Sequence, residues 1–472
     1  VYNVCGGRKK CGKILAGEKE TYMMQIVRWM VREPKWEEKV QRFIKGDEEI
    51  SESEEVEVVS EEELWRFAKM MALFVNRAQQ KFLAGENTLR KSVEQRFREE
   101  GVTRRERLFV ELGAECYRRY HWYLLDEKKR MQLAKVGLGD YGTDFNLLVS
   151  WASKLISKGG KEVKELLGEK KYILIDEYQD FSQLFLSVVM AIRKVVPEVK
   201  LFVVGDDWQA INRFAGSDVE YFQRFEEYFT EDAKRLIIST NYRCNYEIVE
   251  RARKFMKKGM GEKGEFRAFS KRAGKVVLVE PSLTKCRVAL VEHDRRVRVR
   301  DRIYMEMTRR MLGREAKRST VRYIKTIVQV IKKNRKAKEI MLLHRNNETN
   351  LEGMSLVGLR RGLKWGLLKL GVMSEEEFEN KVQVMTMHKS KGLEAEVVII
   401  LEADEGVIPK THPDTILYMV FGETQEVSLA DQKRLFYVAM TRAKKRLYII
   451  HDSGCGEGFV RYLGKNVEKD EN

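Results

Sequence analysis

The sequence predicts an α/β protein with two tandem parallel-sheet units, and three observations support this fold class. Two short apolar runs, YILID (172–176) and LFVVG (201–205), have β-strand character and end in polar residues. Between them, SQLFLSVVMAIRKV has helical spacing, and this strand–helix–strand order indicates a parallel sheet with helical crossovers. A second set of strand-like runs follows and predicts a second unit: 235–239, 339–344, 382–386, 396–401 and 446–450.

The region before these runs is predicted to be mostly helical. Residues 47–63 hold ten acidic residues and no basic one, which is typical of a solvated connection. Within this block, Ser60 and Glu63 form a capping box that predicts the start of a helix through LWRFAKMMALFVNRAQQKFL. Apolar residues at helical spacing continue from there to about residue 150.

The composition favours a polyanionic partner. Lys and Arg total 89 against 72 Asp and Glu, which gives a formal net charge of +17. Such an excess of positive charge is most often found in proteins that bind nucleic acid. A content of 34% charged residues is also typical of the surface of a thermostable protein. Twelve of the basic residues fall in 285–318 against five acidic ones. That segment either contacts phosphates or forms a solvated helix face.

Membrane and extracellular classes are disfavoured. No apolar run reaches the roughly 18–20 residues needed to cross a bilayer, and the N-terminus lacks the pattern of a secretory signal. The six cysteines are scattered with no C-x-x-C pair, which disfavours a disulfide framework and a zinc site. We predict a cytoplasmic protein without a membrane partner.

The string DEYQD, at the end of the first predicted strand, is the strongest chemical signal. It places Asp176 and Glu177 at the carboxyl end of a strand, where ligands bind in open α/β sheets. An aspartate there can hold Mg²⁺, while the adjacent glutamate orients and deprotonates an attacking water. The alternative for an isolated acidic pair is a solvated turn.

Two further blocks add candidate phosphate-sensing and base-stacking residues. In GDDWQAINRFAG, Gln209 could sense a γ-phosphate, and the aromatic Phe214, beside Arg213, could stack on a base. STNYRCN then offers Tyr242 next to Arg243.

The last two blocks follow in the second predicted unit. MTMHKSKGLEAEVVII places His388, Lys391 and Glu394 just beyond a strand. KRLFYVAMTRAKKRLYII is predicted to place Arg442 in a helix that leads to the final strand. Arginines that face a transferring phosphoryl group accelerate the reaction by roughly 10³–10⁵.

Together, in this order, the five blocks resemble the superfamily 1 DNA helicases of the UvrD/Rep type, and within them most closely the helicase IV branch. The resemblance runs from about residue 65 to the C-terminus and rests on DEYQD, GDDWQAI, NYR, T-x-H-x-x-K-G-L-E and YVAMTRAK. It implies a motor that moves three-prime to five-prime and hydrolyses ATP, with Mg²⁺, between two RecA-like domains. Single-stranded DNA and duplex junctions are the implied partners.

The resemblance also implies a role for each matching position. Asp176 would coordinate Mg²⁺, Glu177 would be the catalytic base, and Gln209 would couple the γ-phosphate to DNA movement. In the second domain, the implied roles are adenine stacking for Tyr242, γ-phosphate contact for Arg243, nucleotide-sugar contact for Glu394 and an arginine finger for Arg442.

The implied DNA contacts lie in both domains. Asn212 occupies a position that this family usually fills with Tyr, so one stacking contact is replaced by a hydrogen-bonding side chain. The full predicted DNA-binding set is Asn212, Arg213, Phe214, Thr386, His388 and Lys391.

With this family in view, four segments are predicted. They are an N-terminal remnant with the acidic linker (1–63), a helical accessory insertion (64–150), the C-terminal part of a first, incomplete RecA-like domain (151–230) and a second RecA-like domain (231–472) with a basic insertion at about 255–335.

The phosphate loop is the part that the sequence does not spell out. GRKKCGKI (7–14) fits G-x-x-x-x-G-K, but Ile14 replaces the hydroxyl residue that would bind Mg²⁺, and only six residues precede Gly7. We therefore interpret 7–13 as a coincidence and expect the chain to be the C-terminal portion of a split or truncated helicase. Two alternatives stay open: an ATPase-inactive single-stranded DNA-binding remnant, and a subunit whose phosphate loop comes from a separate chain.

Overall fold

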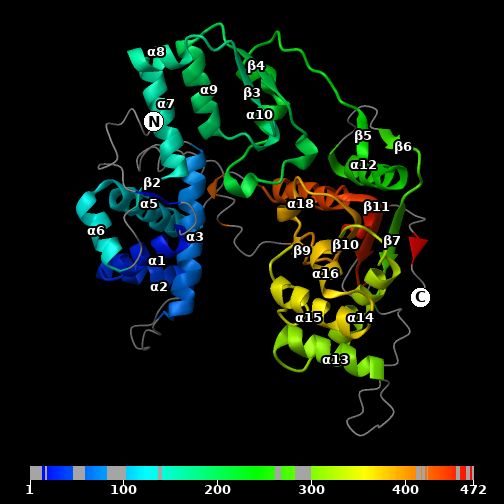
Figure 1. The fold of residues 1–472 in the computed structure, drawn as a ribbon. Helices are drawn as coiled ribbons and strands as arrows, with labels where there is room; N and C mark the ends of the chain where they lie inside the picture. Colours follow the sequence, from blue (N-terminus) through cyan, green and yellow to red (C-terminus); the bar gives the residue numbers. More distant parts are fainter. Residues whose placement is uncertain are drawn as a thin grey trace. The chain divides into compact units, whose positions relative to one another are not determined.

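The chain folds into two compact units in the computed structural model (Figure 1). The first comprises residues 1–233 with 413–425, and the second comprises 234–412 with 426–472. The structure describes residues 13–15, 19–45, 59–81, 103–136, 141–260, 267–281, 299–410, 416, 420–421, 424–452, 458–463 and 468–469.

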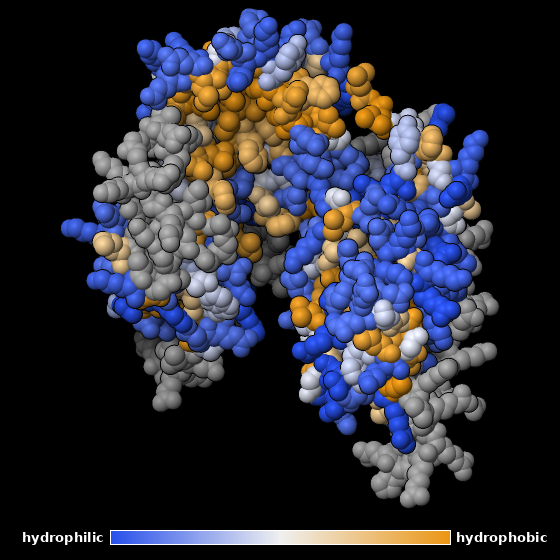
Figure 2. All heavy atoms as spheres, in the orientation of Figure 1, coloured by the Kyte–Doolittle hydropathy of each residue, from blue (hydrophilic) through white to orange (hydrophobic). Residues whose placement is uncertain are grey.

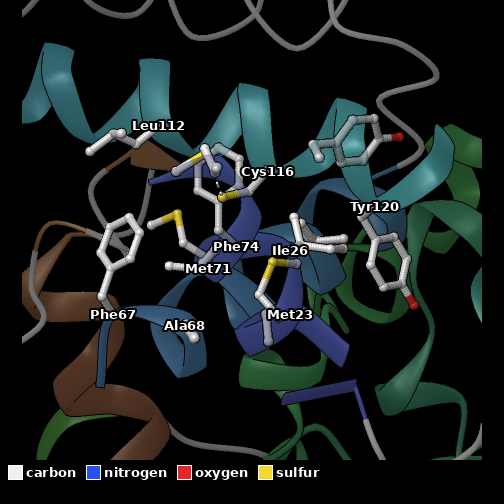
Figure 3. Close-up of a cluster of buried hydrophobic side chains, with 14 of the residues drawn as sticks. Met23, Ile26, Phe67, Ala68, Met71, Phe74, Leu112, Cys116 and Tyr120 are labelled. Carbon is white, nitrogen blue, oxygen red and sulfur yellow. Dashed lines mark hydrogen bonds between the residues drawn. The ribbon is translucent and has the colours of Figure 1, made fainter. Parts of the chain in front are cut away.

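The N-terminal part of the first unit is a helical layer. Its described elements are β1 (Lys13–Leu15), α1 (Lys19–Met30), α2 (Pro34–Lys45), α3 (Glu61–Gln80), α5 (Arg104–Leu125), α6 (Glu127–Lys135) and β2 (Tyr141–Asp144). The predicted capping box is confirmed, because the Ser60 side chain accepts from the Glu63 N–H and Glu63 accepts from the Ser60 N–H. Helices α1, α2, α3 and α5 bury one apolar core, in which Phe74, Met71 and Cys116 are labelled in Figure 3.

The rest of the first unit surrounds a parallel pair of strands, β3 (Tyr172–Ile175) and β4 (Lys200–Val203). One face of the pair packs on an aromatic cluster that includes Tyr178, Phe181 and Tyr221. The accompanying helices and short 3-10 turns are α7 (Phe145–Lys158), α8 (Lys161–Leu167), η1 (Tyr178–Asp180), α9 (Gln183–Val195), η2 (Asp207–Gln209), η3 (Arg213–Ala215), α10 (Glu220–Gln223) and α11 (Phe225–Tyr228).

The other face of this strand pair is apolar and exposed. Leu174 lies opposite Phe202 in the register, and both side chains are exposed, as are Tyr172 and Val204. Figure 2 shows hydrophobic surface over the part of the molecule where β3, β4 and α9 lie in Figure 1. Parallel sheets normally have both faces covered. Within the described residues, this sheet therefore has a face that further polypeptide could cover.

The second unit is built on a six-stranded sheet of order β12-β7-β11-β10-β8-β9, in which every neighbouring pair is parallel. Strand β8 is buried along its whole length, as expected for a parallel sheet covered on both faces. The strands are β7 (Lys275–Val279), β8 (Ile340–His344), β9 (Val382–Thr386), β10 (Ala395–Ile400), β11 (Ala443–Ile450) and β12 (Glu468–Lys469).

Helices and a small second sheet complete this unit. Strands β5 (Thr240–Asn245) and β6 (Arg267–Ser270) form a parallel pair of their own. A large apolar core joins α13, α14 and α15 to one face of the six-stranded sheet. The described helices are α12 (Tyr246–Met260), α13 (Val299–Leu312), α14 (Arg318–Lys333), α15 (Leu356–Lys369), α16 (Glu375–Lys381), the 3-10 turns η4 (His388–Ser390) and η6 (Val460–Tyr462), and α18 (Gln425–Met440).

The predicted fold class is confirmed, with one strand wrongly placed. The runs at 172–176, 201–205, 339–344, 382–386, 396–401 and 446–450 all contain strands. The run at 235–239 contains none: its apolar centre, Leu236–Ile238, is more than three-quarters exposed, and the strand begins at Thr240. No described helix is long and apolar enough to cross a membrane.

Candidate nucleotide and DNA sites

The predicted acidic pair stands at the carboxyl end of β3. Both Asp176 and Glu177 are exposed, and the Glu177 N–H donates to Asp176 Oδ1 at 2.8 Å. Glu177 has a left-handed backbone (φ 50°), a conformation that is uncommon outside glycine and frequent at functional sites. Both exposed residues follow the last residue of β3, so a ligand at this end of the strand can reach them.

Gln179 connects the two acidic motifs of the first unit. Its Nε2 donates to Glu177 Oε2 at 2.5 Å, and its Oε1 accepts from the Asp206 N–H at 3.0 Å. The side chain is buried, and a Cβ added to Gly205 would lie 2.5 Å from Gln179 Oε1. A glycine at that position therefore lets the amide bridge the ends of β3 and β4. Sequence reasoning did not select Gln179, although it lies within the quoted DEYQD string.

Gln209 is held by the same motif that contains Asp206. Gln209 Nε2 donates to Asp206 Oδ2 at 2.8 Å, while Asp206 Oδ1 accepts from the Trp208 N–H at 3.0 Å. Hydrogen bonds thus link Glu177, Gln179, Asp206 and Gln209 in one chain, in which Gln179 reaches the backbone N–H of Asp206 and Gln209 reaches its carboxylate. The structure brings together the predicted base and the predicted γ-phosphate sensor in the first unit.

The predicted DNA residues of the first unit follow directly after this network. Asn212 donates to Asp180 Oδ2 at 2.7 Å, which ties it to the DEYQD segment. Arg213 Nη1 lies 3.8 Å from Asp218 Oδ1, and the Arg213 side chain is mostly buried. Phe214 on η3 is exposed. Of the three, Phe214 presents the most surface to a nucleobase.

In the second unit, three charged residues from three segments meet. Arg243 Nε donates to Glu394 Oε2 at 2.8 Å, and Lys444 Nζ lies 2.5 Å from Glu394 Oε1. The hydrogen bond from Lys444, with that from Arg243, holds the pKa of Glu394 below its usual range. Two predicted nucleotide residues, 151 positions apart in sequence, are therefore adjacent in space.

A turn at Asn241 sets the direction of the neighbouring Tyr242 and Arg243. Asn241 Oδ1 accepts from the N–H groups of Arg243 (3.0 Å) and Cys244 (2.9 Å). Such side-chain-to-backbone bonds replace strand pairing and bend the chain locally. Tyr242 is 70% exposed at this bend.

Arg442 differs from its predicted setting. It lies in a turn two residues after α18 rather than in a helix, and its side chain is 1% exposed. Its guanidinium donates to the backbone carbonyls of Val438 (2.9 Å) and Leu393 (3.3 Å). The structure places it beside the Glu394 segment, but with its donors directed to protein groups.

The remaining predicted DNA residues begin at the carboxyl edge of the six-stranded sheet and continue into the segment between β9 and β10. Thr386 ends β9 at the carboxyl edge, and His388 follows on η4, whereas Glu394 directly precedes β10 at the amino edge. Burial, with the positive charge of Arg345, lowers the pKa of His388 to about 4, so its imidazole is neutral near pH 7. Lys391 is half-buried just beyond η4. Thr386 and Glu394 therefore lie at opposite edges of the sheet, and Lys391, three positions before Glu394, lies in the segment that connects them.

A buried titratable cluster, which sequence reasoning did not select, follows strands β8, β10 and β11. His344 Nε2 lies 3.0 Å from Glu402 Oε2, and both side chains are buried. Nearby, Asp404 Oδ1 accepts from the Asp452 N–H at 2.7 Å. Burial, and then the charges of Glu402 and Asp452, raise the pKa of Asp404 to about 7.

The glycine-containing segment 7–13 lies outside the described residues except for Lys13. Lys13 begins β1, which pairs in parallel with β2 rather than with β3 or β4. A phosphate loop leads from a strand into a helix N-terminus, whose amides hold the phosphates. Because only Lys13 of this segment is described, the interpretation of 7–13 as a coincidence stays a prediction.

The donor set at the end of β3 suits Mg²⁺ that arrives with a nucleotide. Among the described residues, no group of three or more His, Cys, Asp or Glu side chains could hold a metal ion. Mg²⁺ commonly binds through one or two carboxylates together with substrate phosphates, and Asp176 offers an exposed carboxylate of this kind.

Comparisons with known proteins agree with the motif order. The model of the UvrD/REP helicase N-terminal domain matches residues 11–230, and that of the UvrD-like helicase C-terminal domain matches 359–454. DNA helicase IV of Escherichia coli is 27% identical over 329 residues, which cover 69% of this chain and 39% of that protein.

Shorter matches point the same way. ATP-dependent DNA helicase PcrA of Staphylococcus aureus is 31% identical over 115 residues, covering 24% of this chain and 14% of that protein. DNA helicase II of Rickettsia typhi is 39% identical over 77 residues, covering 16% and 11%. The matched part of the chain thus spans about two-fifths of the length of the helicase IV relative. It spans a smaller share of the PcrA and helicase II relatives. With both domain models matched in order, the chain belongs to the UvrD/Rep family of DNA helicases.

Proposed function

We propose that this chain is the ATP-hydrolysing, DNA-translocating portion of a helicase that moves three-prime to five-prime on single-stranded DNA. The observation that carries this proposal is the Glu177–Gln179–Asp206–Gln209 network, which fixes a glutamate at the end of a parallel strand. Family membership supports the DNA substrate, and the direction of movement is taken from the resemblance.

In the first unit, Glu177 acts as the general base. Its carboxylate orients a water molecule and takes its proton as the water oxygen attacks the γ-phosphorus and the bond to the β,γ-bridging oxygen breaks. Gln179 holds the Glu177 carboxylate in place, while Asp176 would hold Mg²⁺, which neutralises charge on the phosphates when bound. Gln209 contacts the γ-phosphate, and its hydrogen bond to Asp206 connects that contact to the rest of the network.

In the second unit, the residues around Glu394 bind the nucleotide. Tyr242 stacks on adenine, Arg243 contacts the γ-phosphate and Glu394 accepts from the sugar hydroxyls. The Arg243–Glu394 ion pair supports this assignment because it holds the guanidinium in a defined position before nucleotide binds. Arg442 serves as the arginine finger only after its guanidinium exchanges backbone carbonyls for phosphate oxygens.

DNA binding uses an aromatic contact and a polar loop. Phe214 stacks on a base of the single strand, which is worth roughly 1–3 kcal/mol for any sequence. Asn212 and Arg213 beside it, and Thr386, His388 and Lys391 in the second unit, contact the strand through polar groups. A neutral His388 can both donate and accept a hydrogen bond.

We propose that the phosphate loop comes from polypeptide outside the described residues, including the option of a separate chain. A strand added beside β3 or β4 would bring its own carboxyl end to the edge that carries Asp176. A helix following that strand would cover the exposed face of Leu174 and Phe202. One strand–loop–helix segment would therefore supply the phosphate loop and also cover the exposed sheet face that carries Leu174 and Phe202.

A second candidate function is single-stranded DNA binding without hydrolysis. The burial of Arg442 and the strand that follows 7–13 favour it over an autonomous motor. In that case, Phe214 in the first unit and Thr386, His388 and Lys391 in the second would still bind single-stranded DNA.

The test is ATP hydrolysis by the purified chain, with and without single-stranded DNA and with Mg²⁺ present or chelated. The proposed function predicts Mg²⁺-dependent hydrolysis that rises when single-stranded DNA is added. DNA binding by fluorescence anisotropy with no hydrolysis under any of these conditions would contradict it in favour of the binding-only function.

A further inference from the structure

Two aromatic side chains lie next to each other on the surface of the second unit. The rings of Tyr242 on β5 and Phe269 on β6 have centroids 4.8 Å apart and planes inclined by 34°. Both are well exposed, Tyr242 by 70% and Phe269 by 66%. Single exposed hydrophobic side chains are common on protein surfaces, whereas these two rings are in contact and directly precede in sequence, at Tyr242, the ion-paired Arg243.

The backbone fixes this pair in place. Asn241 pairs with Ala268 in the β5–β6 register, which shifts directly after this pair, and the rings of the next residues, Tyr242 and Phe269, are in contact there. Ser270 Oγ donates to Asn245 Oδ1 at 3.0 Å, which joins the two strands again beyond the aromatic pair. The Asn241 turn restrains Tyr242 from its own side.

The contact with Phe269 restrains the Tyr242 ring but leaves much of it accessible. An inclined ring at 4.8 Å makes the offset contact that aromatic pairs prefer, so Phe269 restrains the Tyr242 ring. With 70% of Tyr242 still exposed, much of its surface stays accessible to a flat ligand. Arg243, which follows Tyr242 in sequence, is held by Glu394 and can meet the phosphates of the same ligand.

We propose that Phe269 is a positioning residue for the nucleobase: it holds the Tyr242 ring ready to stack on the adenine of ATP. The proposal rests on the proposed function, in which Tyr242 stacks on that base. Without Phe269, binding would have to immobilise a freely rotating tyrosine, and the lost ring contact would weaken nucleotide binding.

The expected effect follows from the aromatic contact. Aromatic pairs contribute about 0.5–1.5 kcal/mol beyond their buried area, so Phe269→Ala should raise the Kd for ATP about 2- to 10-fold. Phe269→Tyr keeps the ring and should restore most of the affinity. Because Phe269 acts through Tyr242, the double variant with Tyr242→Ala should bind ATP no more weakly than Tyr242→Ala alone.

Equilibrium dialysis of the full chain with ATP and MgCl₂ measures these constants, and Phe145→Ala, at another exposed phenylalanine, is the control. CTP is a second probe: the smaller base gains less from stacking, so Phe269→Ala should reduce the preference for ATP over CTP. Where the chain turns over ATP, KM should rise with kcat unchanged, a separation that general loss of structure would not give.

The outcomes separate this inference from the proposed function. If the wild-type chain binds no ATP, the proposed function and the inference both fail. If it binds ATP and Tyr242→Ala weakens binding while Phe269→Ala does not, the inference alone is overturned. Additive losses in the double variant, or an effect of Phe269→Ala on single-stranded DNA affinity rather than on ATP, would also overturn it.

Discussion

Asp404 should make the stability of the second unit fall as pH rises. Its carboxyl group is buried after β10 near Glu402 and Asp452, and its pKa is raised from 3.8 to about 7. The folded chain therefore retains a proton that the unfolded chain loses near pH 4, so the unfolded state is favoured progressively as pH rises through this window.

The size of the effect follows from the two pKa values. Between pH 5 and pH 8, a group with pKa 3.8 unfolded and about 7 folded costs the folded state about 2–3 kcal/mol. Asp404→Asn keeps the shape and the acceptor for the Asp452 N–H but cannot ionise. The free energy of unfolding of the variant should therefore gain about 2–3 kcal/mol on that of the wild type between pH 5 and pH 8.

Urea unfolding of both proteins at pH 5, 6, 7 and 8, followed by circular dichroism, measures this difference. The other ionisable groups are common to both proteins, so the comparison isolates Asp404. Parallel pH profiles for wild type and variant would contradict this prediction, because they would mean that Asp404 has a similar pKa in the folded and unfolded chain.

Two further perturbations test the first unit. Gln179→Leu removes the hydrogen bonds to Glu177 and Asp206 and should lower kcat for ATP roughly 30-fold, equivalent to about 2 kcal/mol, with little change in far-ultraviolet circular dichroism. Phe74→Ala removes a fully buried ring that packs edge-on against Phe109 at 5.6 Å and should destabilise this unit by about 3–5 kcal/mol in urea unfolding.

Each of these has a control and a contradicting result. Leu73→Ala, at the exposed neighbour of Phe74, should change stability by roughly 0.5 kcal/mol, and an equal loss in both variants would contradict the assigned core. For Gln179→Leu, an unchanged kcat would show that the amide bridge does not position Glu177.

Local sequence signals predicted much of the fold because the physics behind them is local. The capping box at Ser60 and Glu63 formed, and the runs around β8, β9 and β10 became strands. The run at 235–239 is rich in β-branched residues, but its apolar centre is exposed, and β propensity largely reflects packing against neighbours. The first strands, β1 and β2, are too short to show a period.

The sequence predicted which residues belong to the candidate site but not which of them are in contact. The Arg243–Glu394 ion pair joins positions far apart in sequence, so only the fold could reveal it. Gln179 could be found only by seeing that its amide spans two strand ends. Arg442 was predicted in a helix because its flanking residues have helical character, but α18 ends at Met440 and the side chain turns inward.

The central claim is that Glu177 is the general base of an ATP hydrolysis reaction. The most direct test compares DNA-stimulated ATP hydrolysis by the wild-type chain, Glu177→Gln and the exposed control Glu169→Gln. Glu177→Gln should lower kcat roughly 10²- to 10⁴-fold, with ATP still bound, and Glu169→Gln should leave it unchanged. Hydrolysis that persists at the wild-type rate in Glu177→Gln would contradict it.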